Sequence, residues 1–217
     1  GDVYKRQVTI SDTLFRCKLN IKGTIMAVVA MDKQTKKIVS LREKVVENIL
    51  TWNVPKEGEW KVMVFVCVED GDPNVNYLSP EAVKLFVQDT HEAYYKKFPE
   101  AFGSVITTTF FDEPTMYRAQ GRMWTDDFND KFISRFGFSP EVLYPALWYD
   151  IGPCTAVARN YLFGMRASLY TEGFMKTISD WAEAHGIIST GHQDQEEVVN
   201  PVRVSGDLML DGKYMGM

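Results

Sequence analysis

The period of the hydrophobic pattern changes near residue 70, and this change constrains the fold more than any other feature of the sequence. Over residues 8–68, short β-branched runs alternate hydrophobic and polar residues and are separated by turn-forming residues. This pattern predicts an antiparallel β subdomain over residues 8–70. After residue 70 the spacing is that of amphipathic helices alternating with buried strands, which predicts an α/β fold with a parallel sheet over residues 71–217.

Local signals place the elements of this second part. Ser79 and Pro80 predict a helix start, because a hydroxyl N-cap is followed by proline at the first helical position. The β-branched run at 104–111 predicts a buried strand, and the sequence further predicts helices at about 126–136 and 154–185 and a strand at 187–190. These strands are too few to close a barrel of eight.

Composition excludes some classes of function. The chain has 217 residues and a net charge of −5, which argues against nucleic acid as a partner because phosphate contacts need a basic face. No apolar run is long enough to span a bilayer, and no signal peptide opens the chain. Aromatic residues make up 13%, a share that suits stacking on sugars and equally suits a large core.

Both ends of the sequence are unusual. Residues 1–7 resemble an in-frame translation of a library-sequencing adapter, so we leave them out of the expected fold. The last residues show no helix cap or closing element. We therefore expect a fragment of a metagenomic gene, truncated at its C-terminus. A natural start codon at the source locus would refute this hypothesis.

The strongest candidate for chemistry is the run Phe-Phe-Asp-Glu-Pro at 110–114. An apolar strand ends there in two carboxylates, Asp112 and Glu113, and in α/β barrels the catalytic groups lie at such strand ends. Adjacent strand residues point to opposite faces, so only one of the two faces a given site. Partial desolvation can raise the pKa of such a carboxyl group and suit it to general-acid catalysis. A polar turn that caps a helix explains the same residues equally well.

A second candidate follows the strand at 187–190. Gly191 permits close approach of a ligand to the backbone, and His192 would lie at the same face as Glu113. A histidine satisfied by loop hydrogen bonds is the plainer interpretation. Arg118, Arg122 and Trp124 are candidates to bind hydroxyls or stack on a sugar, and are equally compatible with ordinary surface residues.

Together these motifs resemble glycoside hydrolase family 106, the α-L-rhamnosidase-like enzymes of bacteria that degrade plant polysaccharides. The resemblance extends from about Trp52 to the C-terminus, with Asn76 where an aspartate is expected. It rests on Val-Asn-Tyr-Leu-Ser-Pro-Glu-Ala-Val at 75–83, Thr-His-Glu-x-Tyr-Tyr at 90–95, Phe-Phe-Asp-Glu-Pro at 110–114, Trp-Thr-x-Asp-Phe at 124–128, Ile-x-Asp-Trp-x-x-x-His-Gly at 178–186, Thr-Gly-His at 190–192 and Ser-Gly-Asp at 205–207.

The resemblance implies a (β/α)8 TIM-type catalytic barrel, present here in part, with an inserted antiparallel β subdomain. It implies an inverting mechanism with two glutamates, no required cofactor, and calcium near the site as an option. By residue it assigns Glu113 as one catalytic carboxylate and gives Asp112, His192 and Trp124 substrate-binding roles. The second carboxylate is expected beyond residue 217, so the fragment alone should be inactive. Within the chain, Glu196 and Glu197 are the only late candidates for it, and they are most simply explained as part of a solvated loop.

The implied substrate is a terminal α-L-rhamnoside of plant polysaccharide, and the implied location is secreted or periplasmic. Two alternatives stay open at this point. One is a non-catalytic carbohydrate-binding remnant, and the other is a retaining, β-galactosidase-like barrel glycosidase.

Overall fold

The computed structural model describes residues 2–10, 13–69, 74–117 and 121–216. The chain divides into two compact units. Unit 1 comprises residues 1–70 and 126–162, and unit 2 comprises residues 71–125 and 163–217. The sequence placed a boundary near residue 70 but assigned all of 71–217 to the barrel part. In the structure, residues 126–162 instead group with the β strands that precede residue 70.

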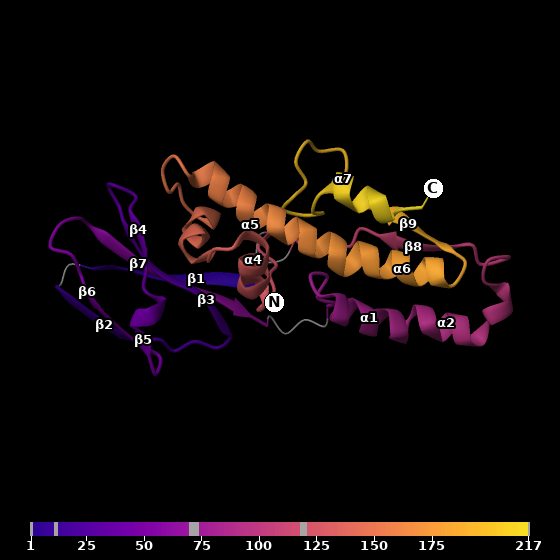
Figure 1. Cartoon of the computed structure of the whole chain (residues 1–217), viewed down its shortest axis with the longest axis horizontal. Coiled ribbons are helices and arrows are strands. Elements are labelled where there is room, and N and C mark those ends of the chain that lie inside the picture. The colour runs from indigo at the N-terminus through magenta and orange to yellow at the C-terminus, as the bar shows by residue number, and fades with distance from the viewer. Residues whose placement is uncertain (1, 11–12, 70–73, 118–120, 217) are drawn as a thin grey trace. The chain divides into compact units, whose positions relative to one another are not determined.

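Unit 1 contains two antiparallel sheets (Figure 1). The sheet character predicted for this region is therefore confirmed, although the first strand also includes residues 2–7, which we had left out of the expected fold. The four-stranded sheet has the order β1 (Asp2–Ile10), β7 (Trp60–Val68), β3 (Thr24–Asp32) and β4 (Ile38–Ser40), and the three-stranded sheet has the order β2 (Leu14–Lys18), β6 (Ile49–Asn53) and β5 (Val45–Val46).

The central strands β3 and β7 are buried on both faces, which explains their nearly continuous apolar sequences. One face contributes to a core with β6, in which Trp52 and Trp60 meet edge to face with their ring centroids 5.5 Å apart. On the other face, Phe65 of β7 contacts Tyr144, with 5.6 Å between ring centroids. The Asn129 side chain donates a 2.7 Å hydrogen bond to the carbonyl of Met26 in β3.

The helical segments that supply this second layer are α4 (Phe128–Phe136) and the 3-10 helix η3 (Glu141–Leu147). Gly137 ends α4 in the left-handed conformation, as the sequence predicts. A sheet with two apolar faces needs a layer on each. Residues 126–162 therefore belong with the β strands, although their helical period resembles that of unit 2.

Unit 2 begins with α1 (Pro80–Asp89), where the Ser79 hydroxyl accepts a hydrogen bond from the Ala82 amide as the predicted N-cap. A continuous helical run follows later in the chain and passes from α5 (Thr155–Tyr170), of which residues 163–170 belong to unit 2, through a π-helical turn, η4 (Thr171–Met175), into α6 (Lys176–Ala184) (Figure 1). The remaining elements are α2 (His91–Lys97), η2 (Pro99–Ala101), β8 (Thr108–Asp112), β9 (Ile188–His192), α7 (Leu208–Asp211) and η5 (Gly212–Tyr214).

Strands β8 and β9 pair in parallel, as predicted for this part of the chain. Strand β8 begins at Thr108, so the predicted start at residue 104 is wrong. The preceding residues prolong the end of η2 instead, because the Ser104 hydroxyl and amide both donate to the carbonyl of Ala101. Gly103 reverses the chain there with a φ of 76°.

One face of this strand pair packs on helices. Phe111 meets Phe174 of η4 at 5.6 Å between ring centroids, and a 2.9 Å hydrogen bond joins the Thr109 hydroxyl to His91 of α2. Residues of the other face, including Phe110 and Ile188, are exposed. The described part of unit 2 thus holds a pair of parallel strands, and the complete barrel stays a prediction.

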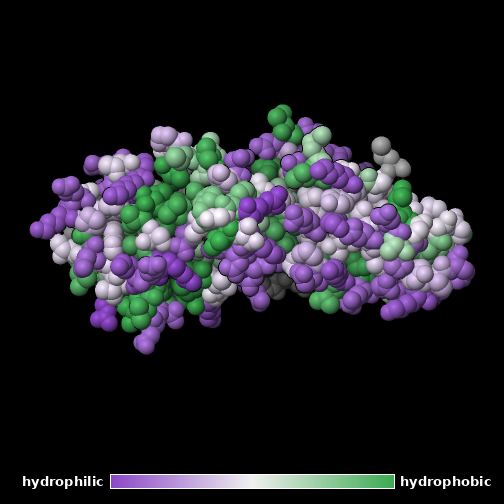
Figure 2. Space-filling view, viewed as in Figure 1, coloured by the Kyte–Doolittle hydropathy of each residue, from purple (hydrophilic) through white to green (hydrophobic). Residues whose placement is uncertain are grey.

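Charged and polar residues cover most of the molecular face shown in Figure 2, with smaller hydrophobic areas among them. Among the described residues, no helix is both long enough and apolar enough to cross a membrane.

Candidate active site

The carboxyl ends of β8 and β9 bring the two predicted motifs together. Asp112 lies opposite His192 in the parallel register, and 3.6 Å separates the Asp112 Oδ1 and His192 Nδ1 atoms. Both side chains are exposed, so solvent screens the attraction between them. The pairing follows from sheet geometry, because parallel strands of similar length end at the same edge.

Glu113 continues this edge in an unusual backbone conformation. Its φ is 48°, in the left-handed region that few non-glycine residues adopt, and its amide donates a 3.0 Å hydrogen bond to the carbonyl of His192. Pro114, which follows, is buried. Strained backbone of this kind is common at functional sites, and here it turns the chain directly after the strand end.

The Glu113 side chain is exposed. The predicted desolvation of this carboxyl group is therefore wrong for the described residues, because none of them covers the strand end. An exposed carboxylate can accept a hydrogen bond from a ligand hydroxyl.

Tyr117 belongs to the same edge and was missed by the sequence analysis. Its hydroxyl accepts a 2.7 Å hydrogen bond from Gln195 Nε2. A hydrogen bond to Asp194 raises the pKa of Tyr117, and the negative charge of Glu113 adds to this effect. Glu113 therefore lies close enough to act electrostatically on Tyr117. Position was the only available signal, since Tyr117, Asp194 and Gln195 follow the two strand ends within a few residues.

Trp124 does not belong to the cluster of polar residues at the strand ends. Its side chain is fully buried, and the guanidinium carbon of Arg166 lies 5.9 Å from its ring centroid. The predicted stacking of a sugar on Trp124 is therefore not available, because the ring packs inside unit 2. Arg118 lies outside the described residues, and the loop residues Glu196 and Glu197 are exposed.

No group of three or more histidine, cysteine, aspartate or glutamate side chains among the described residues is arranged to hold a metal ion. The donors at the strand ends, Asp112 and His192, thus form a pair rather than a coordination shell. Calcium stays an expectation of the family resemblance.

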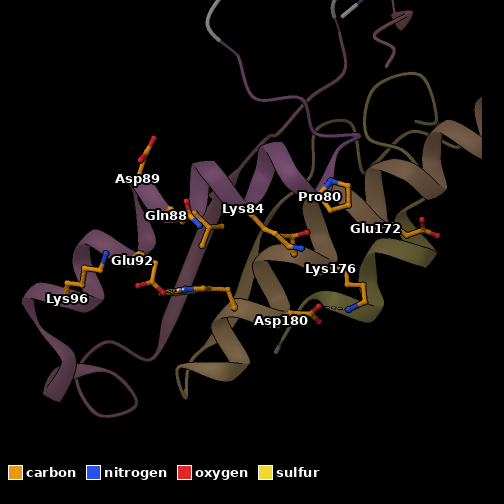
Figure 3. A pocket seen from close by; sticks show the side chains of 12 residues that line it. Pro80, Lys84, Gln88, Asp89, Glu92, Lys96, Glu172, Lys176 and Asp180 are labelled. Carbon is orange, nitrogen blue, oxygen red and sulfur yellow. Dashed lines mark hydrogen bonds and ion pairs between the residues drawn. The ribbon is translucent and has the colours of Figure 1, made fainter. Parts of the chain in front are cut away.

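A separate groove of about 910 Å³ lies between helices of unit 2. Figure 3 shows Lys176 and Asp180 of α6 turned toward each other, and Glu92 of α2 accepts a 2.7 Å hydrogen bond from Trp181 Nε1. The residues that line the groove include none of the strand-end residues, and they carry both positive and negative side chains. The groove is therefore distinct from the candidate active site.

No protein-family model matches the chain, and no curated protein matches it. Among solved structures, the chain is similar to a rhamnosidase from Novosphingobium sp. PP1Y, with a TM-score of 0.56 and 18% sequence identity. The match covers 87% of this chain and 19% of that protein, so the chain spans about a fifth of its length. At this identity the likeness shows a shared fold.

Proposed function

We propose that this chain is part of a glycoside hydrolase that cleaves terminal α-L-rhamnosides by a two-carboxylate mechanism. The observation that carries the proposal is the juxtaposition of Glu113, Asp112 and His192 at the carboxyl ends of two parallel strands. The fold shared with part of a rhamnosidase supports the same assignment. The complete catalytic unit is a (β/α)8 barrel, of which β8 and β9 are neighbouring strands.

In this mechanism Glu113 is one of the two carboxyl groups that flank the scissile bond. One group protonates the leaving oxygen, while the other activates water on the opposite face of the sugar. In an inverting enzyme about 6.5–9.5 Å separates the two, and in a retaining enzyme about 5–5.5 Å. The second carboxylate comes from a part of the enzyme outside this chain, so the 217 residues alone should not turn over substrate.

Asp112 and His192 bind the sugar beside Glu113. Asp112 Oδ1 accepts from substrate hydroxyls, and His192 both donates and accepts through its ring nitrogens. The Tyr117 hydroxyl, which accepts a hydrogen bond from Gln195, is a further polar group at the same edge. These exposed groups become effective when the rest of the barrel and the bound sugar displace water, because hydrogen bonds and charges act more strongly in a dry site.

The test compares variants of the polypeptide that the source gene encodes, with an aryl α-L-rhamnoside as substrate. Glu113→Gln should lower kcat by several orders of magnitude while substrate binding is retained, because the amide can neither donate nor accept the required proton. Glu197→Gln is the matched control, since Glu197 is an exposed glutamate of the loop after β9, and it should leave turnover unchanged. Unchanged turnover in Glu113→Gln would refute the assignment. The anomeric form of the first product separates inversion from retention.

A further inference from the structure

Three buried polar side chains of one helical run contact the segments that follow both strands of the site. They are Arg166 and Tyr170 of α5 and Thr171, the first residue of the π-helical turn η4. Arg166 donates to the carbonyls of Gly121 and Val202, which lie in the segments after β8 and β9. Buried donors of this kind are costly unless they are paired, so their partners specify the arrangement of the two segments.

Tyr170 holds the segment that follows Glu113. Its hydroxyl donates a 2.7 Å hydrogen bond to the carbonyl of Pro114, the residue directly after Glu113. Burial raises the pKa of Tyr170 well above its usual value, so the group remains a donor at all ordinary pH values. This contact fixes the chain on the far side of the left-handed turn at Glu113.

Thr171 holds the segment that follows His192 through an intermediate, Asp211. The Thr171 hydroxyl hydrogen-bonds Asp211 Oδ1, and Gln193 Nε2 donates to Asp211 Oδ2 over 2.9 Å. Gln193 is the residue directly after His192, and it is buried where His192 is exposed. Thr171, Asp211 and Gln193 therefore form a chain of contacts from the helix to the residue next to His192, the candidate sugar-binding histidine.

The two contacts come from consecutive helix residues at the start of the π turn. A π turn is rare and occurs most often at functional sites. Gly173 lies within it, where a β-carbon would stand 2.2 Å from the carbonyl oxygen of Tyr77. The close approach of η4 to the segment around Tyr77 thus depends on glycine at position 173. The same turn begins next to Tyr170 and Thr171, which contact Pro114 and Asp211.

We propose that Asp211 is a positioning residue, which orients His192 by holding Gln193 against Thr171. Stability alone does not account for a buried carboxyl group here, because apolar residues of similar volume at 211 and 193 would avoid its desolvation. The hydrogen bonds among Thr171, Asp211 and Gln193 instead hold Gln193 in a single arrangement, and this arrangement sets the orientation of the neighbouring His192 side chain. The catalytic value of that orientation rests on the proposed function, whereas the positioning itself does not.

The test is NMR spectroscopy of the 217-residue chain, whose three histidines are well suited as reporters. His192 lies edge to face with Phe110 at 5.2 Å between ring centroids, so its ring protons carry a ring-current shift. Asp211→Ala should remove that shift, because Gln193 loses its acceptor. Asp211→Asn should restore it, because the amide offers Gln193 an oxygen and Thr171 a donor.

The signals of His91 and His185 should stay unchanged in both variants and report that unit 2 is folded. Unchanged His192 signals in Asp211→Ala would overturn the proposal, as would an Asn variant that behaves like Ala. If the Ala variant unfolds, Thr171→Val removes one hydroxyl from the far end of the contact chain and should still move the His192 signals. No movement there would equally overturn the proposal.

A kinetic measurement with the complete enzyme separates this proposal from the proposed function. Asp211→Ala should raise KM more than it lowers kcat, because His192 is assigned to bind the sugar, and Asp211→Asn should recover most of the loss. If no rhamnoside is turned over by any variant, the proposed function fails while the NMR result for His192 still decides the positioning role.

Discussion

Replacement of Asp211 by asparagine tests whether burial disfavours the ionised form of this carboxyl group in the folded chain. Burial raises the pKa of Asp211 from 3.8 to about 6, although the hydrogen bonds from Thr171 and Gln193 act in the opposite direction. The negative charge of Asp207 adds to the rise, and the ionised carboxylate in turn raises the pKa of Tyr170. Protonated Asp211 is matched closely by asparagine, which offers one donor and one acceptor in the same places.

The sign and size of the effect follow from the pKa difference. Between pH 3.8 and about 6 the folded chain binds more protons at Asp211 than the unfolded chain does, so stability falls as pH rises through this window. Each unit of pKa difference corresponds to about 1.4 kcal/mol, so ionisation costs about 3 kcal/mol above pH 6. Asp211→Asn removes this cost. As pH rises from 4 to 8, the stability advantage of the variant over the natural chain should therefore grow by about 2–3 kcal/mol.

The assay is urea unfolding of both proteins at several pH values, followed through NMR signals of unit 2 such as those of His91. The difference in unfolding free energy should be smallest near pH 4, grow through pH 6 and level off above it. Subtracting the two proteins cancels the other titrating groups, which they share. A difference that does not change with pH, or a variant that is less stable at pH 8, would refute the argument that burial disfavours ionised Asp211.

Three further outcomes are expected. Burial lowers the pKa of His91, so as pH falls the unfolded chain protonates this histidine before the folded chain does, and unit 2 should lose stability below pH 6.5. An NMR titration in which His91 of the folded chain gains its proton at or above pH 6.5 would contradict this prediction. Gly173→Ala should cost about 1–3 kcal/mol in urea unfolding, because its β-carbon would stand 2.2 Å from the Tyr77 carbonyl oxygen. Gly164→Ala is the matched control in the same helical run, has nothing within 4 Å, and should stabilise by up to about 1 kcal/mol; equal effects at the two glycines would rule out the steric argument. Arg166→Met should destabilise unit 2 by about 1–3 kcal/mol, because the carbonyls of Gly121 and Val202 lose the hydrogen bonds that Arg166 donates to them. A variant that unfolds at the same urea concentration as the natural chain would contradict this prediction.

Local elements of the fold could be predicted because their signals are local. Ser79 caps α1 through its own hydroxyl, and Gly137 ends α4 with a positive φ, so neither depends on distant residues. The grouping of residues 126–162 with unit 1 could not be predicted in this way. It depends on the second apolar face of β3 and β7, and the sequence does not show which helix covers that face.

The proximity of Asp112 and His192 could be predicted from two strand ends and a parallel sheet, but the contacts that support them could not. Arg166 and Asp211 are each flanked by apolar residues, in Gly-Met-Arg-Ala and Met-Leu-Asp-Gly, and this is the one signal that marks them. A charge within an apolar helical run is expensive to bury, so it persists only where fixed backbone or side-chain groups satisfy it. In this chain those groups belong to the segments after β8 and β9, as the bonds of Arg166 to Gly121 and of Asp211 to Gln193 show. Charges in such apolar runs therefore indicate where a helix holds the loops of a site, and they identify the supporting residues that strand-end motifs leave out.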